Sequence, residues 1–596
     1  MTTDVRKRDG SESGRDTGDG TVAGGAFLTA PVGARGIFTP EQLTDEQRAI
    51  RDAVNAFVER EVGPRRNAVE AKEYATHREL LERMGRDGFL GVDVPEAFGG
   101  AGLDRITSVV VNEAMAPAGS FAVTCMAHTG IGTLPIVFFG TDEQKRRYLP
   151  GLAAGTTVGA YALTEPSAGS DAMAIRTRAI RQEDGAWRLD GVKQFITNAG
   201  FADLFTVYAK IDGEQFSAFL VERSTPGLSV GAEEAKMGLH GASTCPVTLD
   251  GVVVPDENLL GEPGKGHRVA FNVLNVGRFK LAAACLGGMR PSVGIAATYA
   301  GQRSAFGRKI ADFPLIGSKL AAMAARTYAV ESVVYRIAGL LEARLAAAED
   351  ATSPEAMRAA LEEYAVECSL AKVLASEELA FVVDELVQIH GGYGYIEEYP
   401  AAPAYRDARI HRIWEGTNEI NRLLVPGTLL KRAMSGRLDV LGPARRAQDA
   451  LLGGELPTFE GSLAAERAAV AATRTSTLLL AGAAVQRFGT RLEDEQEVLA
   501  GLADLTIDLF AMESVVERAT ATPAPVHGDL ARLVVAERAA AVEQRAKSLA
   551  ARVAEGDEAR TLSAGIRRLM RTEPVDRIEI SRRIAGAVME RTGYPI

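Results

Sequence analysis

Cysteine is scarce in this sequence, and no cysteine is close to another. Four occur in 596 residues. No C-x-x-C pair is among them, so neither a zinc site nor a disulfide framework is indicated. We expect each to be a small buried apolar side chain, which suits a reducing cytosol. The four are Cys125, Cys245, Cys285 and Cys368.

Long apolar runs are absent as well. No run of roughly 18 uncharged apolar residues occurs, so we expect no membrane-spanning helix. The N-terminus has no apolar segment of the secretory type, and its first twenty residues mix four basic with five acidic side chains. Mitochondrial transit peptides are poor in acidic residues. We therefore expect a cytoplasmic protein of bacterial type.

Basic residues are fewer than acidic residues in this sequence. The net charge is −11, from 67 Lys and Arg against 78 Asp and Glu, and the pI is near 5.4. This balance argues against general nucleic-acid binding, while a local basic patch for a phosphorylated ligand stays open. The chain is too long for one hydrophobic core, and its length predicts roughly three to five domains.

The residue pattern changes along the N-terminal half. Residues 1–36 are rich in Gly, Ser, Asp and Thr, and we expect them to be disordered. Residues 37–158 have helical periodicity, with Ile50, Val54 and Phe57 on one face. In residues 159–270, short runs of β-branched and aromatic residues lie between Gly, Asn and Asp turn signals, which predicts a small antiparallel β-domain.

Helical periodicity returns in the C-terminal half. Residues 271–430 predict long packed helices in a bundle. Residues 431–596 begin with a looser Gly- and Pro-containing stretch and then become helical again. One apolar stripe there has the spacing of a helix face, namely Leu502, Leu505, Leu509, Met512 and Val516. The fold class predicted is mainly α with a small β-domain.

One carboxylate, Glu415, stands in an unusual setting, within RDARIHRIWEGTNEINR at residues 406–422. Trp414 precedes it and a glycine follows, and Thr417 and Asn418 are helix-capping types. Burial beside Trp414 would raise the pKa of Glu415 to ~6–7, as a general base requires. The N–H groups at the helix start can face an anion such as a cofactor phosphate. Taken alone, Glu415 could equally be a charge that complements the helix dipole.

Four other motifs give that carboxylate a context. They are YALTEPSAGSD from Tyr161, QFITNAG from Gln194, RSAFGRKI from Arg303 and QIHGGYGY from Gln388. Each alone can be read as an ordinary turn or a solvated helix face. Together with IWEGTNEI they strongly resemble the acyl-CoA dehydrogenase family, and Gln388 precedes Glu415 by 415 − 388 = 27 residues, as in medium-chain members.

The resemblance covers roughly residues 37–430, and residues 503–519 resemble the extra C-terminal region of the very-long-chain type. It implies an N-terminal helical domain (37–158), a middle β-barrel (159–270), a C-terminal four-helix bundle (271–430) and an extra helical domain (431–596). It also implies that FAD is the cofactor.

The resemblance assigns site residues one by one. In the family, Arg303 reaches the flavin pyrophosphate of the partner subunit, and Phe195 stands where a tryptophan is usual. The residues assigned to the cofactor are Ala162, Leu163, Thr164, Gly169, Ser170, Phe195, Ile196, Thr197, Arg303, Phe306, Phe313, Gln388, Gly391, Gly392, Thr417 and Asn418. Those assigned to the substrate are Ser170, Asn275, Arg278 and Gly416. His390 is expected to pack rather than to react.

The function implied is FAD-dependent α,β-dehydrogenation of a long-chain fatty acyl-CoA to the trans-2-enoyl-CoA, as in fatty acid β-oxidation. Glu415 would be the base, since Gly277 occupies the place where some relatives carry it instead. Electrons would pass to an electron-transferring flavoprotein. Two alternatives stay open: an acyl-CoA oxidase on the same fold, and a non-catalytic assembly or scaffold protein.

Three finer expectations follow from the resemblance. Ala127, Gly130 and Gly132 stand where medium-chain relatives carry an acidic residue and its neighbours, so we expect room for a long acyl chain. The tail should occupy the space of a second dimer, which predicts a homodimer. Very-long-chain relatives use the same segment for membrane attachment, but acidic residues such as Glu493 and Glu495 weaken that reading here.

Overall fold

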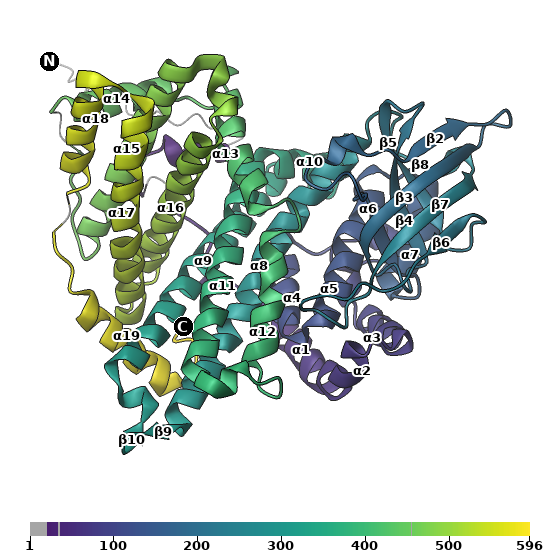
Figure 1. Ribbon diagram of the computed structural model, residues 1–596, viewed down its shortest axis with the longest axis horizontal. Coiled ribbons are helices and arrows are strands. Elements are labelled where there is room, and N and C mark those ends of the chain that lie inside the picture. Colours follow the sequence, from purple (N-terminus) through teal and green to yellow (C-terminus); the bar gives the residue numbers. More distant parts are fainter. Residues whose placement is uncertain (1–20, 34–35, 454–455, 572) are drawn as a thin grey trace, which may run out of the picture.

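The computed structural model describes residues 21–33, 36–453, 456–571 and 573–596. Short helices come first, a twisted sheet follows, and long helices fill the centre and the C-terminal side (Figure 1). Mainly helical structure with one small β-domain is what the sequence predicts.

The N-terminal helices begin where the sequence supplies caps. The Thr44 hydroxyl accepts from the Gln47 N–H at 3.1 Å, and the Asp104 side chain caps the fourth helix. Of the predicted apolar face, Val54 and Phe57 are buried. The helices are α1 (Asp45–Phe57), α2 (Arg66–Glu70), α3 (Tyr74–Arg86), α4 (Arg105–Met115), α5 (Ser120–Ala127), α6 (Leu134–Phe139) and α7 (Asp142–Ala154).

The middle segment forms an eight-stranded sheet with the order β6-β7-β3-β2-β4-β5-β8, and β1 pairs with β4. Most pairs are antiparallel as predicted, but β1–β4 and β2–β4 are parallel, which the sequence did not indicate. The register shifts in β3 between Lys193 and Ile196, where Phe195 has a φ of 59°. The strands are β1 (Gly159–Ala162), β2 (Arg178–Arg181), β3 (Trp187–Thr197), β4 (Leu204–Ile211), β5 (Gln215–Glu222), β6 (Leu228–Val230), β7 (Thr244–Val254) and β8 (Leu259–Leu260).

Long helices form the centre of the molecule. Helix α8 packs on α9 and α11, and the β9–β10 hairpin projects from the end of α8 (Figure 1). The elements are α8 (Gly266–Gln302), β9 (Ser304–Ala305), β10 (Arg308–Lys309), α9 (Pro314–Ala346), α10 (Pro354–Glu363), α11 (Ala365–His390), α12 (Ala401–Ala408) and α13 (Asn418–Met434).

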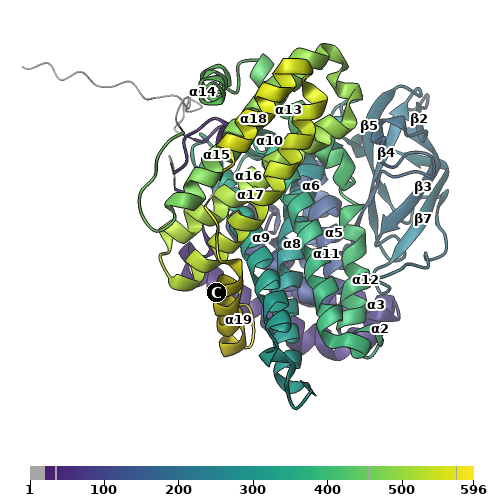
Figure 2. The ribbon, with the colours of Figure 1, turned by 60° about the vertical axis from the view of Figure 1, so that its left-hand side comes forward.

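The C-terminal helices cover the bundle on the side away from the sheet (Figure 2). Helix α16 packs against α9 and α13, and all five residues of its predicted apolar stripe are buried. The tail therefore continues the central core. Its helices are α14 (Leu441–Leu451), α15 (Ala464–Phe488), α16 (Gln496–Ala521), α17 (Pro525–Val553), α18 (Gly556–Leu569) and α19 (Arg577–Arg591).

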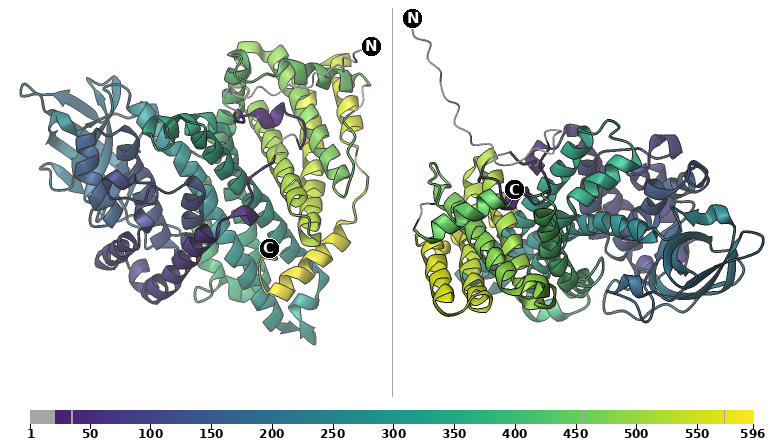
Figure 3. Two further views of the ribbon diagram at one scale, coloured as in Figure 1. Left: turned by 180° about the vertical axis from the view of Figure 1, so that it is seen from behind. Right: turned by 90° about the horizontal axis from the view of Figure 1, so that it is seen from above.

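The structure corrects the prediction of a disordered N-terminal segment for residues 21–33. Phe27 is buried, with its ring centroid 4.7 Å from that of Phe510 in α16. The N–H groups of Gly24 and Gly25 donate to the carboxylates of Glu363 and Glu367, each at 2.7 Å. The left view of Figure 3, seen from behind, shows this segment running across the face of the C-terminal helices. Residues 1–20 lie outside the described part of the chain.

Among the residues that the structure describes, three helical stretches are long and apolar enough to cross a membrane, by length and composition alone. They are Ser120–Phe139, Gly266–Gln302 and Ala464–Asp494. Scattered charges interrupt the apolar runs of these stretches without lowering the average hydropathy much. The expectation that no helix spans a membrane stays a prediction, because length and composition alone place no helix in a membrane. Of the most apolar windows of the three stretches, 78%, 83% and 61% are buried within the protein. Packing between helices thus accounts for their apolar side chains.

Candidate active site

The chain around Glu415 makes a tight turn directly before α13. Glu415 has a φ of 56° and Gly416 a φ of 76°, so two successive residues are left-handed. Glycine adopts this conformation freely, but for a glutamate it costs of order 1–3 kcal/mol and persists only where the surroundings impose it. The turn ends at Thr417, whose hydroxyl caps α13 by accepting from the Ile420 N–H at 3.3 Å. The predicted helix start is thus confirmed.

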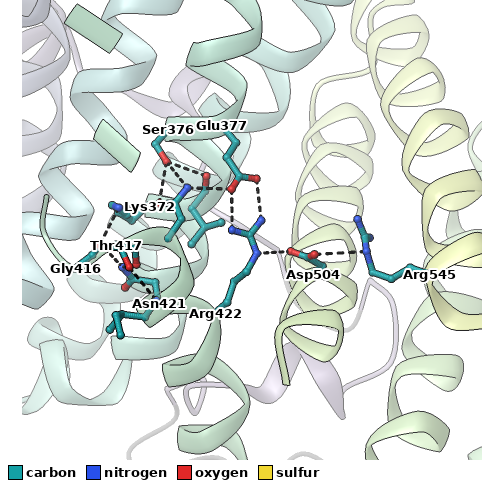
Figure 4. Close-up of polar contacts among 12 residues, drawn as sticks. Lys372, Ser376, Glu377, Gly416, Thr417, Asn421, Arg422, Asp504 and Arg545 are labelled. Carbon is teal, nitrogen blue, oxygen red and sulfur yellow. Dashed lines mark hydrogen bonds and ion pairs between the residues drawn. The ribbon is translucent and has the colours of Figure 1, made fainter. Parts of the chain in front are cut away.

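Three side chains from three helices hold the carbonyl groups of this turn. Arg278 Nε in α8 donates to Glu415 O at 3.2 Å. Lys372 Nζ in α11 and Asn421 Nδ2 in α13 both donate to Gly416 O at 2.8 Å (Figure 4). The sequence analysis missed Lys372 and Asn421. The available signal was a lysine inside the apolar run SLAKVLAS, a residue type that is rarely buried without a partner.

The surroundings of the Glu415 carboxylate favour its protonated form. Its Oε2 atom is covered and has no hydrogen-bond partner among the described residues. Burial raises the pKa of Glu415 to about 7, although the Arg278 and Lys372 charges both act to lower it. The sequence predicts a rise in this direction. A carboxyl with a pKa near 7 exchanges protons readily at neutral pH.

Gly277 provides the space for that carboxylate. A Cβ atom at position 277 would lie 2.4 Å from Glu415 Oε2, which is closer than atoms can approach. Some relatives carry the base at the position of Gly277. In this chain the Glu415 side chain packs directly against that glycine. Burial, the neighbouring Tyr208 and the Glu415 charge all raise the pKa of Tyr161.

The structure brings together two of the segments assigned to the flavin ring. The Gln194 N–H donates to Thr164 O at 2.8 Å, which joins the end of β3 to the residues after β1. The bulge in β3 turns Phe195 outward, and it is 61% exposed. Ala162, Leu163 and Ile196 are buried, so their contact with a cofactor stays a prediction that would involve mainly their backbone groups.

The loop with Gly169 and Ser170 lies on the surface directly after this segment. Both residues are exposed, and nothing lies within 4 Å of a Cβ added at Gly169. Thr197 ends β3 and is partly exposed. These positions leave room for a ligand, and their assignment to cofactor or substrate stays a prediction.

A second group of assigned residues surrounds a pocket of about 500 Å³ at the other end of α8 and α11. Arg303, Gly391 and Gly392 line it, and Arg303 lies over the Tyr393 ring. His390 stacks on Tyr299 with ring centroids 4.1 Å apart and its Nδ1 is hydrogen-bonded to Leu386 O, so it packs as predicted. Close to the pocket are three more assigned residues: Gln388 (exposed), Phe306 (95% exposed) and Phe313, whose ring contacts that of Phe306.

The two groups are far apart within one chain. Figure 1 places the β9–β10 hairpin, which follows Arg303, at the end of the bundle remote from the sheet that carries Phe195. One chain therefore does not assemble all the residues assigned to FAD.

Some assigned residues act inside the protein. Asn418 is 2% exposed, and its side chain bonds to Lys372, Ser376 and Glu377. Only its backbone is left for the predicted cofactor contact. Arg278 Nη1 donates to Asn275 Oδ1 at 2.9 Å, and both residues are nearly buried beneath the turn. Their observed contacts support Glu415, and a contact with CoA stays a prediction.

Comparison with protein families confirms the resemblance. Models of the acyl-CoA dehydrogenase N-terminal, middle and C-terminal domains match residues 44–156, 160–252 and 264–430, and another acyl-CoA dehydrogenase C-terminal domain matches 472–568. A probable acyl-CoA dehydrogenase of Bacillus subtilis (strain 168) is 44% identical over 96% of this chain and 98% of its own length. The human mitochondrial very long-chain specific acyl-CoA dehydrogenase is 37% identical over 81% of this chain and 76% of its own.

Solved structures agree. An acyl-CoA dehydrogenase from Bacillus anthracis, crystallised with FAD, has a TM-score of 0.95 and 44% identity, covering 97% of this chain and 100% of that one. Butyryl-CoA dehydrogenase from Megasphaera elsdenii has a TM-score of 0.59 and 36% identity, covering 65% of this chain and 99% of its own. The chain belongs to the acyl-CoA dehydrogenase family and carries, beyond the three domains of the shorter members, an additional C-terminal helical domain.

Proposed function

We propose that this chain is an FAD-dependent dehydrogenase of long-chain fatty acyl-CoA thioesters, with Glu415 as the catalytic base. The observation that carries the proposal is the Glu415 carboxylate itself: it lies in a strained turn, one oxygen has no partner among the described residues, and its pKa is about 7. Perturbed, unpaired carboxyls of this kind are concentrated at catalytic sites. This geometry also argues against a purely structural scaffold.

The residues present fit FAD. The exposed Phe195 ring and the free loop at Gly169 suit the flavin end of the cofactor. The pocket beside Arg303 is open over Gly391 and Gly392, and a guanidinium matches a diphosphate in charge and geometry. The relative of known structure from Bacillus anthracis was crystallised with FAD, which supports the same assignment here.

The chain's own groups divide the work of the reaction. Glu415 removes the α-proton of the thioester, and Arg278 and Lys372 favour the ionised carboxylate that this step needs. The Glu415 N–H has no acceptor among the described residues and is free to donate to the thioester carbonyl, where negative charge develops. A bound flavin would supply the acceptor for the β-hydrogen and its electron pair. Electrons would then pass to an electron-transferring flavoprotein, in the cytoplasm.

We expect the rate of substrate-driven flavin reduction to depend on pH through Glu415. Because the active form is the carboxylate and its pKa is about 7, the rate should rise through neutral pH and level off above it. Below pH 7 it should fall by about tenfold per pH unit. Stopped-flow bleaching of the flavin across this range tests the prediction. A rate independent of pH from about 5 to 9 would contradict it.

We expect the turnover optimum to lie at a long acyl chain. Gly130 is buried, yet nothing lies within 4 Å of a Cβ added there, so there is unfilled space beside it. Ala127 is also small. Gly132 contributes nothing to this space, since a Cβ there would lie 2.9 Å from the Gly159 carbonyl of β1. Each buried methylene of the substrate adds about 0.8 kcal/mol.

An activity profile across saturated acyl-CoA lengths tests this preference. The variant Gly130→Leu should shift the optimum to shorter chains while keeping activity on butyryl-CoA, which serves as the internal control. A wild-type optimum at butyryl- or hexanoyl-CoA would contradict the long-chain assignment.

We further propose a homodimer in which Arg303 completes the FAD site of the partner. The supporting observation is that the Arg303 pocket lies far from the sheet within one chain. Arg303→Ala should weaken FAD binding by roughly 10- to 100-fold, because a phosphate loses a charge-assisted hydrogen-bond partner.

Mixing of subunits tests whether each FAD site is built from residues of both chains. Arg303→Ala and Glu415→Gln chains, each of low activity alone, should recover part of the wild-type activity when co-expressed. Light scattering should give the mass of two chains. Unchanged FAD affinity in Arg303→Ala, or a stable tetramer, would contradict this arrangement.

A further inference from the structure

The turn that carries Glu415 is connected to the C-terminal helical domain by an unbroken series of polar contacts (Figure 4). The series begins at Gly416 O, which accepts from Lys372 Nζ at 2.8 Å. Lys372 is fully buried, and its second contact is Asn418 Oδ1 at 2.7 Å. A buried ammonium is stable only if it is partnered, so these two acceptors determine where the Lys372 side chain lies.

Asn418 links Lys372 to Glu377, because its side chain contacts both residues. Its Nδ2 donates to Ser376 Oγ at 3.1 Å and to Glu377 Oε1 at 3.0 Å. These bonds fix which side of the amide faces Lys372, because only the oxygen can accept from the ammonium. Lys372, Ser376 and Glu377 lie on successive turns of one face of α11, against the first turn of α13.

Arg422 joins Glu377 to the extra domain. Its Nη1 and Nη2 donate to the two Glu377 oxygens at 2.8 and 2.9 Å, which is a bidentate pair. Its Nε donates to Asp504 Oδ1 of α16 at 2.8 Å. Asp504 in turn pairs with Arg545 of α17 at 3.6 Å. Each of the three guanidinium nitrogens thus makes a contact, two of them within the central bundle and one with the extra domain.

The turn needs such support. Glu415 is held in a left-handed conformation that glutamate disfavours, and every carbonyl from Glu415 to Thr417 accepts from a side chain. A displacement of about 1 Å at a catalytic group can lower a rate by about 10²-fold. Small changes in the orientation of Asn418 and Lys372 are therefore expected to change the rate of the reaction.

We propose that the C-terminal helical domain helps to position the catalytic base: Asp504 orients Arg422, Arg422 with Glu377 orients Asn418, and Asn418 with Lys372 fixes the Gly416 carbonyl. Asp504, Arg422, Glu377 and Lys372 are positioning residues in this scheme, since none of them touches the reacting atoms. The inference rests on the proposed role of Glu415. In this scheme α16 influences catalysis, whereas the sequence predicted only an architectural role for the tail.

The chain offers a matched control. Asp508 lies one turn after Asp504 on α16 and bonds Arg538 and Arg545 of α17, both at 2.6 Å, but makes no contact with Arg422. Asp504→Asn removes the connection to the turn, whereas Asp508→Asn removes the stronger connection between α16 and α17. A purely structural role of α16 would make Asp508→Asn the more harmful substitution.

The test compares the two FAD-loaded variants. Asp504→Asn should lower kcat by roughly 3- to 10-fold at unchanged KM, a range typical of residues that act through a network. It should also speed hydrogen exchange at the Ile420 and Asn421 amides, which bond to Thr417 at the start of α13. Asp508→Asn should change neither quantity by more than about twofold.

Non-additivity provides the second readout. In an Asn418→Ala background the series is already broken, so Asp504→Asn should have no further effect on kcat. Equal effects of Asp504→Asn and Asp508→Asn on exchange, or full additivity with Asn418→Ala, would overturn the inference. The exchange measurement needs no assumption about the base. If Glu415→Gln kept its activity, the proposed function would fail while the contact series could still be detected.

Discussion

Replacing Glu415 with glutamine should lower substrate-driven flavin reduction by roughly 10²–10⁴-fold, the usual contribution of a positioned general base. Glutamine keeps the shape of the side chain but cannot take up the α-proton. Because the turn is held through its carbonyl groups, the backbone and the FAD content should be unchanged. Single-turnover bleaching of the enzyme-bound flavin measures the loss directly.

Glu419→Gln is the matched control for this substitution. Glu419 is exposed in the first turn of α13, four residues from Glu415, and complements the helix dipole. Its rate should stay within about twofold of wild type, since an exposed charge of this kind contributes little. If Glu415→Gln bleached its flavin as fast as Glu419→Gln, Glu415 would not be the base.

Replacing Gly277 with alanine should lower the same rate by roughly 10²-fold. The new methyl group would lie 2.4 Å from Glu415 Oε2 and would displace the carboxylate. Misplacement by about 1 Å has an effect of this size on a rate. FAD binding should be unaffected, because Gly277 is not among the residues assigned to the cofactor and the nearest atoms to the new methyl group all belong to the Glu415 carboxylate.

Gly288→Ala controls for the general effect of glycine substitution in α8. The nearest atom to a Cβ at position 288 is Leu379 Cδ1 at 3.4 Å, an ordinary contact. Alanine also favours a helix over glycine by about 1 kcal/mol, equally at both sites. A Gly277→Ala enzyme with the rate of Gly288→Ala would show that Glu415 does not pack where the structure places it.

The sequence predicted correctly those features that are formed by residues close to one another along the chain. The cap at Thr417, the setting of Glu415 and the apolar stripe of α16 are all local patterns, and the structure contains each of them. A local pattern is readable because the residues that interact lie within one or two turns of each other.

Contacts between distant segments could not be read in this way. Lys372 and Gly416 are 44 positions apart, and Arg422 and Asp504 are 82 apart. The composition of residues 1–36 as a whole, which is rich in Gly, Ser, Asp and Thr, predicted disorder. Within that range, however, the Phe27 ring packs against Phe510, a residue 510 − 27 = 483 positions further along the chain. The parallel pairing of β1 with β4 was missed for the same reason.

The central claim is that this chain uses Glu415 and a bound flavin to dehydrogenate a long-chain acyl-CoA. Anaerobic mixing of the FAD-loaded wild-type protein with palmitoyl-CoA tests it most directly. The account predicts rapid loss of the yellow colour, with formation of the 2-enoyl thioester and slow recovery in air, and no such loss on the same time scale in Glu415→Gln. A flavin that stays yellow with every acyl-CoA offered, or one that bleaches equally fast in Glu415→Gln, would contradict the account.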